Sequence, residues 1–209
     1  GIHESQSRFY ENIIGRSRPF MKVILPKLQE LFPEQLAGVT EEMLYLAANK
    51  AEPSLIRTEA DELTYALHIM VRYEIEKGLF SGIYRAEDLS RIWNEKYKEY
   101  LGIDVPDDRR GVLQDSHWAG GNVGYFPSYA LGNAYGAQIM AKLRQTVDVD
   151  AAVAAGNLHP ITDWLTEHLW KYGAMYDPME VLEKCCEAPF DPKYYTDYLE
   201  KKFTEIYHL

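Results

Sequence analysis

The sequence has little cysteine, and the two cysteines that it has are neighbours, Cys185 and Cys186. Adjacent cysteines rarely bond to each other because the geometry is strained. We therefore expect no disulfide framework, and the chain has no Cys-x-x-Cys pair that would indicate a zinc site. The two thiols are expected to be buried on a helix. Free cysteines fit a reducing compartment, so the cytoplasm is the expected location.

Long hydrophobic runs and an excess of basic residues are also missing. No apolar run reaches the length that crosses a membrane, so no membrane partner is expected. The chain has 22 Lys and Arg against 32 Asp and Glu, which gives a net charge of −10. A general nucleic-acid binder would show a basic face, so no nucleic-acid partner is expected either.

What is present is the composition of a folded protein. Of the 209 residues, 46% are hydrophobic and 26% are charged. This length and composition can support a hydrophobic core. We expect one domain over residues 1–209.

Apolar residues recur at helical spacing over most of the chain. Pro19 and Pro26 should bend or interrupt the first helix, and Thr40 and Thr58 should cap the starts of two others. Asp61 lies where the acid of a capping box would be. The pattern predicts an all-α fold with helices near residues 5–31, 40–49, 58–78, 86–100, 135–146, 150–155, 161–172, 178–187 and 192–207.

Residues 103–134 break this pattern. Glycine and proline recur there, aromatic residues are dense and no helical period holds. Long irregular segments inside domains are usually functional or disordered, and this one is too aromatic for disorder. We expect a loop-rich insert with room for a short β-strand.

The insert carries the densest group of chemically active side chains. Gln114, Asp115 and His117 lie within four positions, and Tyr125 and Tyr129 follow. His117 can donate to a substrate oxygen, Gln114 or Asp115 can orient it, and the phenols can steady an oxyanion. The alternative is a polar network that only holds a long loop in place.

Arg57 stands just before the predicted helix start at Thr58. A guanidinium beside a helix N-terminus is well placed to hold a carboxylate. The alternative is a surface ion pair with Glu59 or Asp61.

Three strings, taken in order, resemble the later signature motifs of the thermostable carboxypeptidases, zinc metallocarboxypeptidases of the Taq type. They are His-Glu-Ser-Gln at 3–6, Ile-Arg-Thr-Glu-Ala-Asp at 56–61 and Gly-Val-Leu-Gln-Asp-Ser-His-Trp at 111–118. Residues 124–132 are also similar to that family. The resemblance implies a largely helical, clam-like metallopeptidase that usually forms homodimers and acts on peptides with a free C-terminal carboxylate.

In this family two zinc ligands come from a His-Glu-x-x-His helix, and a third is the glutamate of His-Glu-Ser-Gln. The resemblance therefore assigns Glu4 as a zinc ligand and gives its neighbour His3 a supporting catalytic role. The chain holds no His-Glu-x-x-His motif. It also opens without methionine, so we expect residues 1–209 to be a single C-terminal fragment of the catalytic domain. We expect this fragment to be inactive alone and not to bind zinc, or the alternative cobalt, in stoichiometric amount.

The resemblance also gives the insert its expected roles. Arg57 and His117 are expected to bind the substrate's terminal carboxylate, with Gln114 and Asp115 beside them. Tyr125 or Tyr129 would stabilise the oxyanion. Two other readings stay open: a non-catalytic helical protein that binds peptides or acts as a scaffold, and a different metallohydrolase whose site forms between chains.

Overall fold

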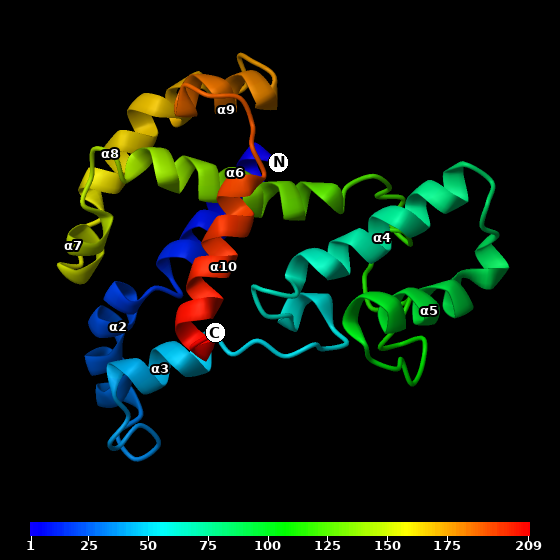
Figure 1. The fold of residues 1–209 in the computed structure, drawn as a ribbon, viewed down its shortest axis with the longest axis horizontal. Helices are drawn as coiled ribbons and strands as arrows, with labels where there is room; N and C mark the ends of the chain where they lie inside the picture. Colours follow the sequence, from blue (N-terminus) through cyan, green and yellow to red (C-terminus); the bar gives the residue numbers. More distant parts are fainter. The chain divides into compact units, whose positions relative to one another are not determined.

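In the computed structural model, which describes residues 1–209, every regular element is a helix (Figure 1). The predicted all-α fold is confirmed. No strand forms in the insert, whose residues up to Phe126 are turns and loops. The helices are α1 (Ile2–Arg8), a π-helix (Phe9–Ile14), α2 (Arg18–Leu31), α3 (Glu41–Ala48), α4 (Tyr65–Phe80), α5 (Leu89–Leu101), α6 (Pro127–Leu143), α7 (Val149–Ala154), α8 (His159–His168), α9 (Pro178–Cys186) and α10 (Lys193–Tyr207). Short 3₁₀ turns occur at Arg57–Glu59, Ala86–Asp88 and Trp170–Tyr172.

The contacts group the chain into two units. Unit 1 is made of Gly1–Asn49 together with Leu131–Leu209, and unit 2 is the continuous segment Lys50–Ala130. Helix α6 begins in unit 2 and continues into unit 1. That residues 1–209 act as one domain stays a prediction.

In unit 1 the first helix packs closely against α6. A Cβ added at Gly132 would come within 2.8 Å of Glu4 Cγ, and one at Gly136 would come within 3.3 Å of the Ser5 carbonyl oxygen. Two glycines four residues apart lie on one face of a helix, so they let the two backbones approach. In the π-helix that follows α1, the buried Asn12 amide donates to Asn133 Oδ1 at 3.2 Å. The start of the chain is thus fixed on α6 by shape and by a buried hydrogen bond.

The core of unit 1 joins its two chain segments. Helix α2 packs on α7, and α7 on α8 (Figure 1). Both cysteines are buried in α9, as expected. The buried core consists of Phe9, Ile14, Tyr135, Ile139, Met140, Leu143, Val149, Val153, Ile161, Trp164, Leu165, Leu169, Val181, Leu182, Cys185 and Cys186.

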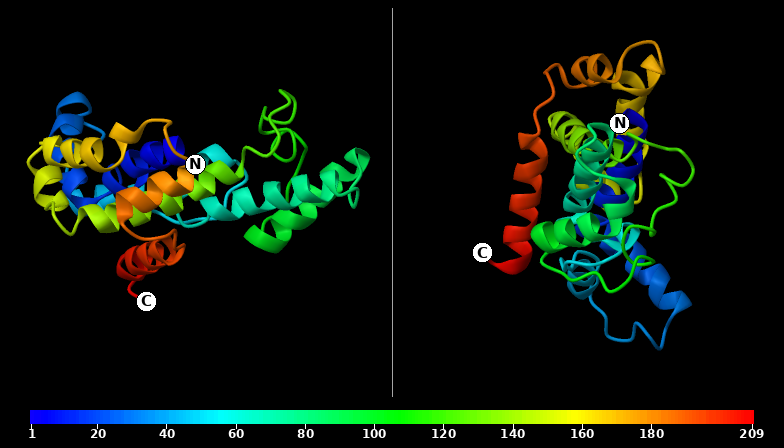
Figure 2. Two further views of the ribbon diagram at one scale, coloured as in Figure 1. Left: turned by 90° about the horizontal axis from the view of Figure 1, so that it is seen from above. Right: turned by 90° about the vertical axis from the view of Figure 1, so that its right-hand side faces the viewer.

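Unit 2 is built on the antiparallel pair α4 and α5, which lie side by side in Figure 1 and in the left view of Figure 2. One face of each helix meets the other in a core of Val71, Ile75, Ile92, Trp93, Tyr97 and Leu101. A second small cluster, Ala60, Tyr65, Ile69 and Phe126, connects the first half of α4 to the insert. The insert therefore lies on α4 through buried aromatic contacts.

The observed helix starts can be compared with the capping residues predicted from the sequence. Ser17 and Thr40 cap α2 and α3 by accepting from the backbone N–H groups of Phe20 and Met43. The cap at Thr40 agrees with the sequence. The predicted start at Thr58 is wrong, because α4 begins at Tyr65. Asp61 instead holds the preceding turn, where its carboxylate accepts from Thr64 N–H at 2.9 Å and Thr64 Oγ1–H at 2.6 Å.

Pro19 and Pro26 also behave differently from each other. Pro19 lies in the first turn of α2, where its missing N–H leaves no bond unmade. Pro26 lies inside α2 without ending it. None of the helices is long and apolar enough to cross a membrane.

Candidate functional site

The centre of the site in unit 2 is one carboxylate held by two arginines. Asp115 Oδ1 accepts from Arg57 Nε and Nη2 at 3.0 and 2.7 Å. Asp115 Oδ2 accepts from Arg72 Nε at 2.7 Å and lies 2.6 Å from Arg72 Nη2. Two guanidinium groups in forked contact give strong, directional bonds. The structure thus replaces the alternative surface pair of Arg57 by a buried ion pair across 58 positions of the chain.

The surroundings change the proton affinities of this pair. Burial alone raises the pKa of the Asp115 carboxyl, but the hydrogen bond from Arg57 and the charges of both arginines outweigh it, so the pKa lies below its ordinary value. Burial lowers the pKa of Arg57, and the bond and charge of Asp115 more than compensate, so that pKa is raised. Asp115 and Arg57 are therefore both charged at neutral pH.

Gln114 ties the same groups together by its side-chain amide. Its Oε1 accepts from the Arg57 backbone N–H and from Arg72 Nη2, both at 2.9 Å. Its Nε2 donates to the carbonyl oxygens of Leu55 at 2.9 Å and Arg110 at 3.0 Å. Gln114 thus fixes the start of the insert to the segment that carries Arg57.

Arg72 was not among the predicted site residues. Its side chain is 0% exposed, and it also donates to the His68 carbonyl at 2.7 Å. Its guanidinium lies 4.6 Å from the Trp93 ring and 5.3 Å from the Phe126 ring. The signal that could have found it is the spacing of His68, Arg72 and Glu76, three polar residues four apart on one face of a mostly apolar helix.

His117 lies beside this cluster. Its Nε2 is 3.1 Å from Tyr129 Oη, and its ring centre is 4.4 Å from that of Phe126. Its Nδ1 lies 3.9 Å from Asp115 Oδ1, beyond hydrogen-bond distance. Burial, with the charges of Arg57 and Arg72, lowers the pKa of His117 against the opposite effect of Asp115, so the imidazole is neutral at pH 7. Its role in binding or catalysis stays a prediction.

The two predicted phenols differ in their surroundings. Tyr129 lies between His117 and Arg57, whose guanidinium is 4.8 Å from its ring centre. Tyr125 is 43% exposed, and its ring centre is 5.3 Å from that of Tyr129. Arg57, Gln114, Asp115, His117 and both tyrosines are therefore brought together in unit 2.

A second buried hydrogen-bond network, around Tyr97, contacts Arg72. Tyr97 Oη accepts from Arg72 Nη1 at 3.3 Å, which leaves its own proton to face His68 Nδ1 at 3.0 Å. Burial and the charge of Arg72 lower the pKa of His68 to about 3. Sequence alone cannot reveal this contact, because α4 and α5 must pair before these groups meet.

Glu76 holds the glycine-rich part of the insert. Its Oε1 accepts from Trp118 Nε1 at 2.7 Å and from the Gly124 backbone N–H at 3.2 Å. Glu76 itself is 5% exposed. One carboxylate oxygen therefore fastens both ends of the exposed segment between these residues.

Glu4 and His3 lie in unit 1, on α1. Glu4 Oε1 is 3.3 Å from Arg8 Nε, and His3 is exposed. Zinc in a catalytic site takes three protein ligands and a water. No group of three His, Cys, Asp or Glu side chains that could hold a metal occurs in residues 1–209. Glu4 can supply one ligand, but the residues present do not form a complete zinc site.

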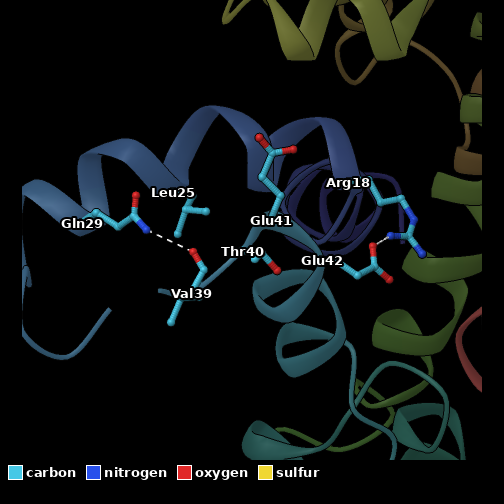
Figure 3. Close-up of a pocket in the computed structure, with 7 residues that line it drawn as sticks. All are labelled: Arg18, Leu25, Gln29, Val39, Thr40, Glu41 and Glu42. Atoms are coloured by element: carbon cyan, nitrogen blue, oxygen red, sulfur yellow. Dashed lines mark hydrogen bonds and ion pairs between the residues drawn. The ribbon is translucent and has the colours of Figure 1, made fainter. Parts of the chain in front are cut away.

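Hollows also occur in unit 1. One, of about 680 Å³, lies between α2 and α3 and is lined by Arg18, Leu25, Gln29, Val39, Thr40, Glu41 and Glu42 (Figure 3). In it Gln29 donates to the Val39 carbonyl at 3.1 Å, and Arg18 is paired with Glu42. These four lining residues are thus already engaged in two pairs.

Comparison with known proteins gives a consistent result. Residues 1–203 match the family described as Carboxypeptidase Taq (M32) metallopeptidase. The chain is 46% identical to Carboxypeptidase 1 of Bacillus subtilis over 210 residues, which cover 100% of the chain and 42% of that protein. It is 44% identical to Thermostable carboxypeptidase 1 of Thermus thermophilus, over 99% of the chain and 41% of that protein. The chain thus spans about two fifths of the length of the relatives that it matches.

Solved structures agree with the sequence matches. The M32 carboxypeptidase from Deinococcus radiodurans superposes with a TM-score of 0.96 at 39% identity, over 100% of this chain and 42% of that one. Metallocarboxypeptidase 1 of Trypanosoma cruzi gives a TM-score of 0.92 at 40% identity, over 97% and 42%.

Proposed function

The chain belongs to the Taq carboxypeptidase (M32) metallopeptidase family, and from this membership we propose that it supplies the substrate-holding part of a zinc metallocarboxypeptidase. The reaction is hydrolysis of the last peptide bond of a peptide. Its substrates carry a free C-terminal carboxylate. The observation that carries the proposal is the buried arginine pair around Asp115, next to a neutral histidine and two phenols.

Arg57 is the group proposed to bind the substrate carboxylate. A guanidinium has five N–H donors. Arg57 uses three of these donors. Its Nε–H and one Nη2–H bond to Asp115, and one Nη1–H bonds to Tyr65 Oη at 3.1 Å. Two donors remain on a side chain that Asp115 and Tyr65 already hold in place, which lowers the entropy lost on binding.

His117, Tyr125 and Tyr129 are proposed to act on the same substrate end. A neutral imidazole can donate one hydrogen bond to a substrate oxygen without a change in charge. Tyr129 positions it through Nε2, and Tyr125 offers a phenol at the exposed side. Gln114 and Asp115 hold Arg57 and do not need to contact substrate.

For the metal, we propose only one of the ligands in this chain and the chemistry that the bound ion would supply. Bound zinc, or cobalt in its place, would polarise a water for attack on the peptide bond. We propose Glu4 as one ligand, with His3 beside it. Since residues 1–209 do not form a complete site, we propose that these residues alone are inactive. A homodimer and a cytoplasmic location also belong to the proposal, the second because both cysteines are free.

The test uses Arg57→Ala in the full-length protein, with Arg109→Ala as the control. Arg109 is an exposed arginine of the same insert, so its loss changes the net charge equally. We expect Arg57→Ala to raise KM and to reduce kcat/KM for free-acid peptides far more than for the same peptides as C-terminal amides. The control should leave both nearly unchanged. Equal losses on acids and amides would contradict the role of Arg57, and binding without hydrolysis by the wild type would favour the non-catalytic peptide-binding protein.

A further inference from the structure

The cluster around Asp115 carries more positive than negative charge. Arg57 and Arg72 share one carboxylate, and the side chains of the three residues are 7%, 0% and 10% exposed. The next buried carboxylate on α4, Glu76, bonds to Trp118 and Gly124 and makes no ion pair with either arginine within 4 Å. A buried charge without a counter-ion is unfavourable, so the cluster should favour an added anion.

Each of the two arginines contacts a different oxygen of the Asp115 carboxylate. Arg72 contacts Oδ2, while Arg57 contacts only Oδ1. Arg72 is fully enclosed by Trp93, Phe126, the His68 carbonyl and Tyr97. It cannot reach a substrate, whereas Arg57 keeps two unbonded N–H groups. Asp115 thus shares its single negative charge between two arginines, and a net charge of +1 on the three residues is left for a ligand.

Building on the proposed function, we propose that Arg72 determines the preference for a free C-terminal carboxylate without contacting the substrate. Its positive charge neutralises the Asp115 carboxylate, so the positive charge of Arg57 stays available to the substrate anion. Arg72 is in this sense a positioning residue. The ligand chemistry that the cluster selects is a single carboxylate.

Charge and structural support can be separated by four variants of the full-length enzyme. Arg72→Met leaves Arg57 and Asp115, with a summed charge of zero. Arg72→Met combined with Asp115→Asn leaves Arg57 alone, with a summed charge of +1 as in the wild type, and the amide oxygen introduced at position 115 can still accept from Arg57. Asp115→Asn alone raises the charge, and Arg72→Lys keeps it. The probes are an N-blocked tetrapeptide as the free acid and the same peptide as the C-terminal amide, with KM and kcat measured for each.

For Arg72→Met we expect KM for the free acid to rise by about tenfold or more, and kcat and the KM of the amide to change little. The double variant should recover most of the loss, although it is further from the wild type in structure. Arg72→Lys and Asp115→Asn should keep the preference for the acid. Thermal unfolding followed by circular dichroism identifies any variant that loses its fold, and the comparison then uses the others.

Two results would overturn the inference. One is a double variant as poor as Arg72→Met while both are folded, since this would show a structural role for Arg72. The other is an unchanged acid preference in Arg72→Met. A wild-type enzyme that shows no preference for acid over amide would instead contradict the proposed function, so the two failures can be told apart.

Discussion

Gly132 lies against Glu4 so closely that a side chain at position 132 has no room. A Cβ there would be 2.8 Å from Glu4 Cγ and 2.9 Å from the Glu4 carbonyl carbon. The second atom belongs to the backbone and cannot turn aside. The position of Glu4 on α1 therefore depends on the lack of a side chain on α6.

The first prediction follows from this contact. Gly132→Ala gains about 1 kcal/mol of helix propensity, but the clash must move α1, so we expect a net loss of roughly 1–3 kcal/mol in the free energy of unfolding. The matched control is Gly136→Ala, with the same propensity gain and a nearest contact of 3.3 Å. Urea unfolding of both variants measures the difference. Equal stability of the two would show that the close approach at Gly132 has no energetic weight.

The second prediction concerns acid stability and His68. Its pKa of about 3 in the folded protein lies below the ordinary 6.5. The unfolded chain then binds a proton between these values while the folded protein does not, so stability falls as the pH falls from about 6.5 towards 3 and is constant above this window. From pH 7.5 to pH 5.0 the loss from His68 should be about 2 kcal/mol.

His68→Asn tests this, because the amide oxygen can still accept from Tyr97 Oη but does not titrate. The variant should be less stable than the wild type at pH 7.5, and the gap between the two should narrow at pH 5.0. Urea unfolding at the two pH values gives both numbers. Parallel pH dependence in the two proteins would be incompatible with a buried neutral His68.

The third prediction concerns the hold of Glu76 on the insert. Glu76→Ala removes the acceptor of Trp118 Nε1–H and Gly124 N–H, and a lost buried acceptor costs about 1–3 kcal/mol. Glu76→Gln keeps an amide oxygen in place and should lose less. Amide hydrogen exchange at Gly124 and the fluorescence of Trp118 report the local change. Protection of Gly124 that is the same in Glu76→Ala and the wild type would rule out this anchor.

Helical periodicity predicted most of this fold because it records which face of each segment is buried. It placed α3 and its cap at Thr40, the body of α4 and helices α7 to α10 near their observed positions. It missed the start of α6, which begins at Pro127 and takes in residues 127–134 of the segment predicted to be irregular. It failed at Thr58, where Asp61 and Thr64 form a local turn that competes with the helix. Pro26 does not interrupt α2, although a proline inside a helix removes one backbone hydrogen bond.

The site was predictable only in those residues that lie in recognisable strings. Arg57, Gln114, Asp115 and His117 come from two such strings, and the structure brings them together. The buried polar groups near these residues come from α4 and α5, and they meet only because distant segments of the chain pack together. They are Arg72, His68, Glu76 and Tyr97. A polar residue on the inner face of a helix indicates that a partner exists but cannot say which segment supplies it.

The division of unit 1 into two chain segments bears on how the protein is made. Unit 2 is continuous, so all of its residues are synthesised before any of Leu131–Leu209. Unit 1 must wait, since Asn12 finds Asn133 only after 121 further positions, and such distant contacts form slowly. The segment Gly1–Asn49, Glu4 included, thus spends part of synthesis with the α6 surface that orders it still missing. A nascent chain that ends before Leu131 therefore holds α1 and α2 without the α6 and α7 surfaces on which they pack, and so exposes apolar surface of the kind that chaperones bind.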